Sequence, residues 1–289
     1  MSVALDPAAW LIEPFAAFGF MRRALVACLA LALGSGPVGV FLVLRRMSLM
    51  SDVLQHGVLP GIAVGAIAAG LSVWAMGLGG VVAGLAVAVV AGWLARRTGG
   101  REDSQLAGMY LLALAAGVAL ISAQHSLDLT HILFGNVLAV DDTALFGMAG
   151  VASVTLPVLA LIWRPLVLES LDPGFMAATA GRGGLWHLLF LVLVVLCVVS
   201  GFVALGTLMS VGLMMLPAIA ARHWSDSLAG QVRVSVLLAC LSSVGGLILS
   251  YNLDIPAGPA IVLFAGGLWV ASLLAGPRGS LWRQAIPEA

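Results

Sequence analysis

Long apolar segments alternate with short polar connections along almost the whole chain. A helix needs about 20 apolar residues to cross a hydrocarbon core about 30 Å thick, and nine runs come near that length. They cover residues 24–44, 58–76, 78–95, 106–123, 144–162, 186–205, 207–221, 231–250 and 257–275. The run at 207–221 is short, and the break at 71–80 between the second and third runs is weak. The pattern therefore predicts an all-α transmembrane bundle of eight or nine spans.

The composition supports a polytopic membrane protein. Of the 289 residues, 62% are hydrophobic and 9% are charged, whereas soluble domains carry about 25% charged residues. No polar stretch is long enough for a soluble domain, so we expect residues 1–289 to form a single transmembrane domain. The 13 basic residues are all arginine, which excludes a phosphate-binding or Schiff-base lysine. Because phosphate-loop, Ser/His/Asp and HExxH motifs are also missing from the sequence, we expect a protein that is not an enzyme.

The arginines predict an orientation in the cell (inner) membrane. If nine spans alternate, Arg22 and Arg23 fall on one side and eleven arginines fall on the other. These eleven are Arg45, Arg46, Arg96, Arg97, Arg101, Arg164, Arg182, Arg222, Arg233, Arg278 and Arg283. Cytoplasmic loops carry the excess of basic residues, so we expect the N-terminus outside and the C-terminus in the cytoplasm.

A polar stretch between two apolar segments carries an acid, Asp52, and an imidazole, His56, four residues apart. On a helix these two side chains share one face. If the helix runs on from Arg46, His56 lies about 15 Å from the membrane surface, near the middle of the bilayer. Pro60 has no N–H to offer the His56 carbonyl, which would then stay free on that face. Ionisable groups at this depth are costly, so the stretch predicts one wall of a polar path.

A carboxylate and an imidazole form half a site for Zn²⁺, Mn²⁺ or Fe²⁺. Further ligands would have to come from Gln55, Ser48, the His56 carbonyl, water or a second subunit. The alternative is a purely structural pair, in which Asp52 and His56 neutralise each other and pin two helices together. The residues alone leave both interpretations open.

Three polar residues, His125, Asp128 and His131, follow the fourth predicted span at intervals of three. They lie on the outer side of the membrane in the predicted topology. One interpretation is a mouth that receives a cation; the other is a solvated loop or a docking surface.

A cytoplasmic connection carries the signals of a short helix. Asp172 is a typical N-cap, Pro173 suits the first helical position, and Gly181 suits the end. Phe175 and Met176 would be exposed on this helix, which indicates a docking site for a soluble partner. The alternative is an interfacial helix that rests on lipid headgroups.

Five ordered stretches resemble the permeases of zinc, manganese and iron ABC importers. They are Gly39–Asp52 continued by His56–Gly61, Arg101–Asp103, Leu133–Val140, Gly206–Arg222 and Asp254–Pro259. The resemblance covers nearly the whole chain. Ser51, Gln55, Gly174 and Met176 depart from the residues usual in that family.

The resemblance implies a homodimer in membrane lipid that works with two cytoplasmic ATPases and an extracytoplasmic metal-binding protein. It implies no permanently bound cofactor and no nucleic acid partner. Asp52 and His56 match positions that line the family's cation path, and residues 172–181 match its ATPase-coupling helix. The expected function is therefore ATP-driven import of zinc, manganese or iron. The alternative is a proton-coupled secondary transporter, in which Asp52 and His56 carry protons and no ATPase takes part.

Overall fold

The computed structural model describes residues 7–48, 50–70, 72–98, 102–122, 137–171 and 183–278. Helices make up nearly all of this part of the chain, and no strand occurs in it. The elements are α1 (Pro7–Ala17), α2 (Gly19–Leu44), α3 (Met50–Gly57), α4 (Leu59–Ala69), α5 (Val73–Thr98), α6 (Glu102–Ser122), the 3₁₀ turn η1 (Val137–Ala139), α8 (Asp142–Leu171), α10 (Gly183–Leu205), α11 (Thr207–Ala221), α12 (Leu228–Leu253) and α13 (Ala257–Ala275). The all-α prediction is confirmed.

Seven helical segments of the described chain are long and apolar enough to cross a membrane. They are Gly19–Leu44, Met50–Ala69, Val73–Ala91, Asp142–Leu171, Leu185–Leu205, Leu228–Leu253 and Ala257–Ala275. Two further apolar helices, Ala107–Ser122 and Thr207–Ala221, are shorter. The predicted multi-span architecture is thus present, whereas the count of eight or nine spans is not confirmed.

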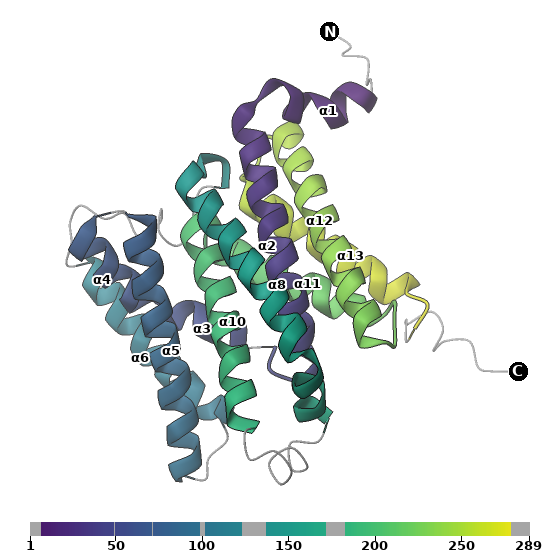
Figure 1. The fold of residues 1–289 in the computed structure, drawn as a ribbon. Coiled ribbons are helices and arrows are strands. Elements are labelled where there is room, and N and C mark those ends of the chain that lie inside the picture. Colours follow the sequence, from purple (N-terminus) through teal and green to yellow (C-terminus); the bar gives the residue numbers. More distant parts are fainter. Residues whose placement is uncertain are drawn as a thin grey trace, which may run out of the picture.

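The helices pack around α2 and α10. Helix α2 contacts α8, α10, α11 and α12, while α10 also contacts α5 on its other side. Helices α4, α5 and α6 form one group, and α11, α12 and α13 form another (Figure 1). Short helix α3 contacts α6 and α5 of the first group, α11 of the second, and α10 between them. The candidate acid and imidazole therefore lie on an element that joins the two groups.

Helix α2 ends in a Schellman motif rather than running on into α3. Arg46 has a left-handed backbone (φ 58°) and donates its N–H to the Val43 carbonyl at 3.2 Å. The Met47 N–H donates to the Leu42 carbonyl at 2.8 Å. These two bonds give partners to carbonyl groups in the last turn of α2. Because α3 begins only at Met50, the expectation of one straight helix from Arg46 to the imidazole is wrong. The depth estimated from that helix does not hold.

A second break separates α3 from α4. Val58 lies between them, and Pro60 falls in the first turn of α4. A proline is well placed there, because the first N–H groups of a helix have no partner within the helix. Val58 nevertheless keeps a right-handed helical backbone (φ −81°, ψ −14°), its N–H donates to the Leu54 carbonyl at 2.9 Å, and its carbonyl accepts from the Ile62 N–H at 3.1 Å. Met50–Ala69 is therefore one helical segment with a break at Val58, and Pro60, which has no N–H, cannot donate to the His56 carbonyl.

Helices α4 and α5 approach each other closely at glycines. A Cβ at Gly61 would overlap the Gly79 carbonyl, and a Cβ at Gly79 would overlap the Gly61 carbonyl. Gly65 meets the Ala75 carbonyl in the same way. Small residues allow membrane helices to pack backbone against backbone. These glycines therefore let α4 lie directly against the first two turns of α5.

Candidate functional site

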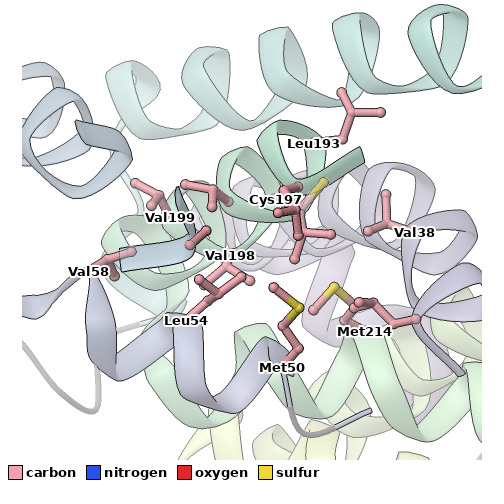
Figure 2. Packing of buried hydrophobic residues seen from close by; sticks show 14 of the residues in the cluster. Val38, Met50, Leu54, Val58, Leu193, Cys197, Val198, Val199 and Met214 are labelled. Carbon is pink, nitrogen blue, oxygen red and sulfur yellow. The ribbon is translucent and has the colours of Figure 1, made fainter. Parts of the chain in front are cut away.

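One apolar face holds α3 in place. Met50, Leu54 and Val58 are almost completely buried, at spacings of four residues. Figure 2 shows Met50 and Leu54 turned toward Met214 of α11 and Val198 of α10. At about 100° per residue, this packing turns positions 52 and 56 to the opposite face of α3.

Asp52 and His56 lie next to each other on that outward face. Their closest atoms, Asp52 Oδ1 and His56 Nε2, are 3.8 Å apart. This is an ion-pair distance and is too long for a hydrogen bond. The Asp52 side chain is 59% exposed and the His56 side chain is 26% exposed. Because both residues belong to α3, their mutual contact does not pin two helices together.

A cleft of about 300 Å³ opens beside the pair. Its polar wall is formed by Asp52, Gln55 and His56 of α3. The facing wall comes from α11 and α13, through Thr207, Leu208, Val211, Gly212 and Val262. The cleft therefore combines three polar side chains on one wall with a mostly apolar opposite wall, and it is large enough for several water molecules or a hydrated ion.

Two buried polar atoms beside this cleft have no hydrogen-bond partner in the described part of the chain. They are Nε2 of Gln55, whose residue is 2% exposed, and Nδ1 of His56. A buried polar group without a partner costs about 1–3 kcal/mol. The Tyr110 ring of α6 lies 5.5 Å from the His56 ring, centroid to centroid. Gln55 and His56 both line the cleft, and each carries a nitrogen whose hydrogen-bonding capacity the described protein groups do not use.

Ser48, the other predicted site residue that the structure describes, does not line this cleft. Ser48 lies in the exposed turn before α3, where its carbonyl accepts a hydrogen bond from Ser51 Oγ at 3.3 Å. The predicted mouth and docking residues lie outside the described residues. They are His125, Asp128 and His131 for the mouth, and Asp172, Pro173, Phe175, Met176 and Gly181 for the docking helix.

Sequence patterns did not reveal Tyr110, Thr207 or Val262 as neighbours of the pair. All three come from helices distant in sequence, so spacing along the chain carries no signal for them. The stretch containing Thr207 was identified as an apolar run and as part of the family resemblance, but neither pattern placed it beside Asp52 and His56.

Taken alone, the described chain offers a metal only a partial site. No cluster of three or more His, Cys, Asp or Glu side chains occurs in the residues that the structure describes. Asp52 and His56 supply one oxygen donor group and one nitrogen donor group. Such a set is suited to brief contact with an ion, because stable sites in proteins use more ligands.

The chain matches known proteins along almost its whole length. The family model "ABC 3 transport family" matches residues 17–276. The manganese import system permease protein ScaB of Streptococcus parasanguinis is 34% identical over 268 residues, covering 92% of this chain and 94% of that protein. The manganese transport system membrane protein MntC of Halalkalibacterium halodurans is 30% identical over 263 residues, covering 90% and 89%.

A solved structure shares the fold. PsaBC from Streptococcus pneumoniae in complex with Fab has a chain that is 31% identical, with a TM-score of 0.84. The match covers 96% of this chain and 99% of that one. The helical arrangement described above is therefore shared with that chain.

Proposed function

Because this chain belongs to the ABC 3 transport family, we propose that two copies of it form the path by which a divalent transition metal enters the cell. The chain is a membrane-spanning transport subunit of a metal ABC importer and not an enzyme. ATP hydrolysis takes place on separate cytoplasmic subunits, and an extracytoplasmic metal-binding protein delivers the ion. The N-terminus lies outside and the C-terminus lies in the cytoplasm.

One observation carries the proposal: the apolar face of α3 turns Asp52 and His56 toward a cleft that is open on the surface of the single chain. Each chain offers two donors, and Asp52 is more than half exposed. A second copy facing the first would raise the number of donors to four and would cover the exposed acid. This argument supports the homodimer.

Manganese is the first cargo to test, because ScaB and MntC are both named as manganese transporters. A carboxylate and an imidazole also accept Zn²⁺ and Fe²⁺, and affinity alone does not decide which metal is selected in cells. The cargo proposed for this chain is therefore Mn²⁺, with Zn²⁺ and Fe²⁺ as competitors in the assay.

Transit requires binding that is weak enough for release. Two donors per chain satisfy this requirement better than a closed cage would. The buried amide of Gln55 can donate a hydrogen bond from Nε2 but cannot bind a cation through that atom. Its unused N–H beside the cleft supports passage of an ion that keeps part of its water shell, with Gln55 donating to a metal-bound or bridging water. Ser48 is the other accessory residue of the path.

The remaining predicted residues belong to the two ends of the path. His125, Asp128 and His131 receive the ion at the outer mouth. Asp172, Pro173 and Gly181 shape the cytoplasmic coupling helix, which contacts the ATPase through Phe175 and Met176. The sequence signals given above support these roles.

Substitution of the two donors tests the proposal. In cells that depend on this chain for Mn²⁺, Asp52→Asn and His56→Gln should each lower uptake of radioactive Mn²⁺ about tenfold or more. Asp226→Asn, a matched change of an acid that pairs with Arg278 away from the cleft, should leave uptake near the wild-type level. Co-purification of the ATPase subunits checks that each variant assembles. Normal uptake by both donor variants would refute the path.

The same cells distinguish the rival mechanism. A proton-coupled secondary transporter would continue to import Mn²⁺ after the ATPase subunits are inactivated, and it would stop when the proton gradient is collapsed at constant ATP. The proposal requires the opposite result in both tests.

A further inference from the structure

We infer that Arg45 is a positioning residue that couples the metal-bearing helix α3 to the two helix ends bordering the connection between α8 and α10. The inference deepens the proposed function and rests on it, because it concerns how ATPase movement reaches the metal path. It depends on a buried charged cluster that the path itself does not use.

The Arg45 guanidinium is held by three polar side chains. Nη2 lies 2.8 Å from Glu169 Oε2, and Nε donates to Ser170 Oγ at 3.0 Å. Nη1 lies 3.1 Å from His187 Nδ1. The same group stacks over the Phe190 ring, with its carbon 4.9 Å from the ring centroid. The side chains of the ion pair are only 7% and 14% exposed.

These partners come from both helices that border the 172–182 connection. Glu169 and Ser170 lie in the last turn of α8, whereas His187 and Phe190 lie in the first two turns of α10. Both helix ends are at the same end of the bundle (Figure 1). One guanidinium therefore holds the end of α8 and the start of α10 in a fixed relation.

Arg45 also connects these helix ends to α3. It is the residue at which α2 ends, and the Schellman motif at Arg46 fixes the direction in which the chain leaves. The Met50 N–H then donates to the Met47 carbonyl at 3.0 Å, which begins α3 one turn later. Because the connection is short and hydrogen-bonded, a shift of the α8 and α10 ends would displace the start of α3.

Stability alone is a weak reason for this cluster. Burying an arginine and a glutamate removes two charges from water, and apolar side chains of similar size often stabilise a protein as well or better. The charged cluster adds a fixed geometry, because a planar guanidinium donates its hydrogen bonds only in set directions. It therefore keeps three helix ends aligned, as a coupling element must.

The test uses the complete complex with its ATPase subunits, reconstituted in lipid vesicles, and measures Mn²⁺ transported per ATP hydrolysed. Arg45→Gln and Glu169→Gln should lower this ratio roughly fivefold or more while ATP hydrolysis continues, within the range of known coupling changes. Arg233→Gln is the matched control: this arginine of α12 is exposed, takes no part in the cluster and should leave the ratio unchanged. An unchanged ratio in both cluster variants would overturn the inference.

A double variant covers the case in which the single variants do not assemble. Arg45→Met with Glu169→Leu removes both buried charges and keeps apolar volume. An assembled complex that hydrolyses ATP but transports little Mn²⁺ supports coupling through Arg45. An assembled complex with the wild-type ratio shows that the cluster only stabilises the structure, and it overturns the inference.

Failure of the inference can be separated from failure of the proposed function. If the wild-type complex moves no metal, or if Asp52→Asn and His56→Gln both move it normally, the proposed path is wrong. If the wild-type complex transports Mn²⁺ through a path that needs Asp52 and the cluster variants keep the wild-type ratio, only the role of Arg45 is wrong.

Discussion

Replacement of Leu54 by alanine tests whether packing of α3 sets the position of the two metal donors. Leu54 is completely buried against α10 and α11, on the face of α3 opposite Asp52 and His56. Buried Leu→Ala changes in soluble proteins cost about 3–5 kcal/mol, of which part is transfer from water and part is the cavity. Unfolded membrane helices remain in lipid, so the transfer part is small here. We therefore expect a loss of about 2 kcal/mol, mainly from lost packing.

The assay is reversible unfolding of the purified protein in mixed micelles, combined with Mn²⁺ uptake in cells. Leu208→Ala is the matched control, because it removes the same atoms from a side chain that lines the cleft but is 45% exposed. We expect this control to cost under about 0.5 kcal/mol. Leu54→Ala should also weaken uptake at low Mn²⁺, since the donors lose their fixed orientation. Equal free-energy changes in the two variants would refute the reasoning.

Four further changes test the helix packing, a buried polar group and the end of α12. Gly61→Ala should cost about 2 kcal/mol or more in the same unfolding assay, because its Cβ would overlap the Gly79 carbonyl. Gly77→Ala meets open space and should stabilise α5 by about 0.5–1 kcal/mol. Gln55→Leu should stabilise the fold by about 1 kcal/mol, because it removes a buried N–H without a partner, and should lower Mn²⁺ uptake. Asp254→Gly, at a left-handed position (φ 54°) after α12, should stabilise by about 1 kcal/mol.

Each of these predictions has a clear contradicting result. Equal effects of alanine at Gly61 and Gly77 would show that α4 and α5 do not meet backbone to backbone. Destabilisation by Gln55→Leu would show that the amide has a structural partner. A loss of stability for Asp254→Gly would indicate that the aspartate side chain, and not its backbone, stabilises the end of α12.

The apolar pattern predicted the spans well where the runs end at strong signals. The segments 207–221 and 257–275 coincide with α11 and α13, which follow Gly206 and Pro256. The segment 144–162 was too short, because α8 continues past Pro165 to Leu171. A hydropathy pattern ends where polar residues begin, whereas a helix continues as long as its backbone hydrogen bonds are satisfied.

The breaks around α3 were harder to predict. A Schellman motif usually places glycine at the left-handed position, and here the residue is Arg46, so the usual signal is missing. The shared face of Asp52 and His56 was predicted from their spacing, and the structure places both at a cleft. The opposite wall comes from α11 and α13, about 150 and about 200 residues further along the chain, and local patterns contain no information on such contacts.

Pulsed EPR of Mn²⁺ bound to the assembled transporter tests the central claim most directly, because it detects nitrogen ligands of the ion. In protein labelled with ¹⁵N-histidine, the wild type should show a ¹⁵N coupling that is lost in His56→Gln and kept in His223→Gln. A wild-type spectrum without histidine nitrogen, or an unchanged coupling in His56→Gln, would contradict the assignment of α3 as the wall that carries the metal.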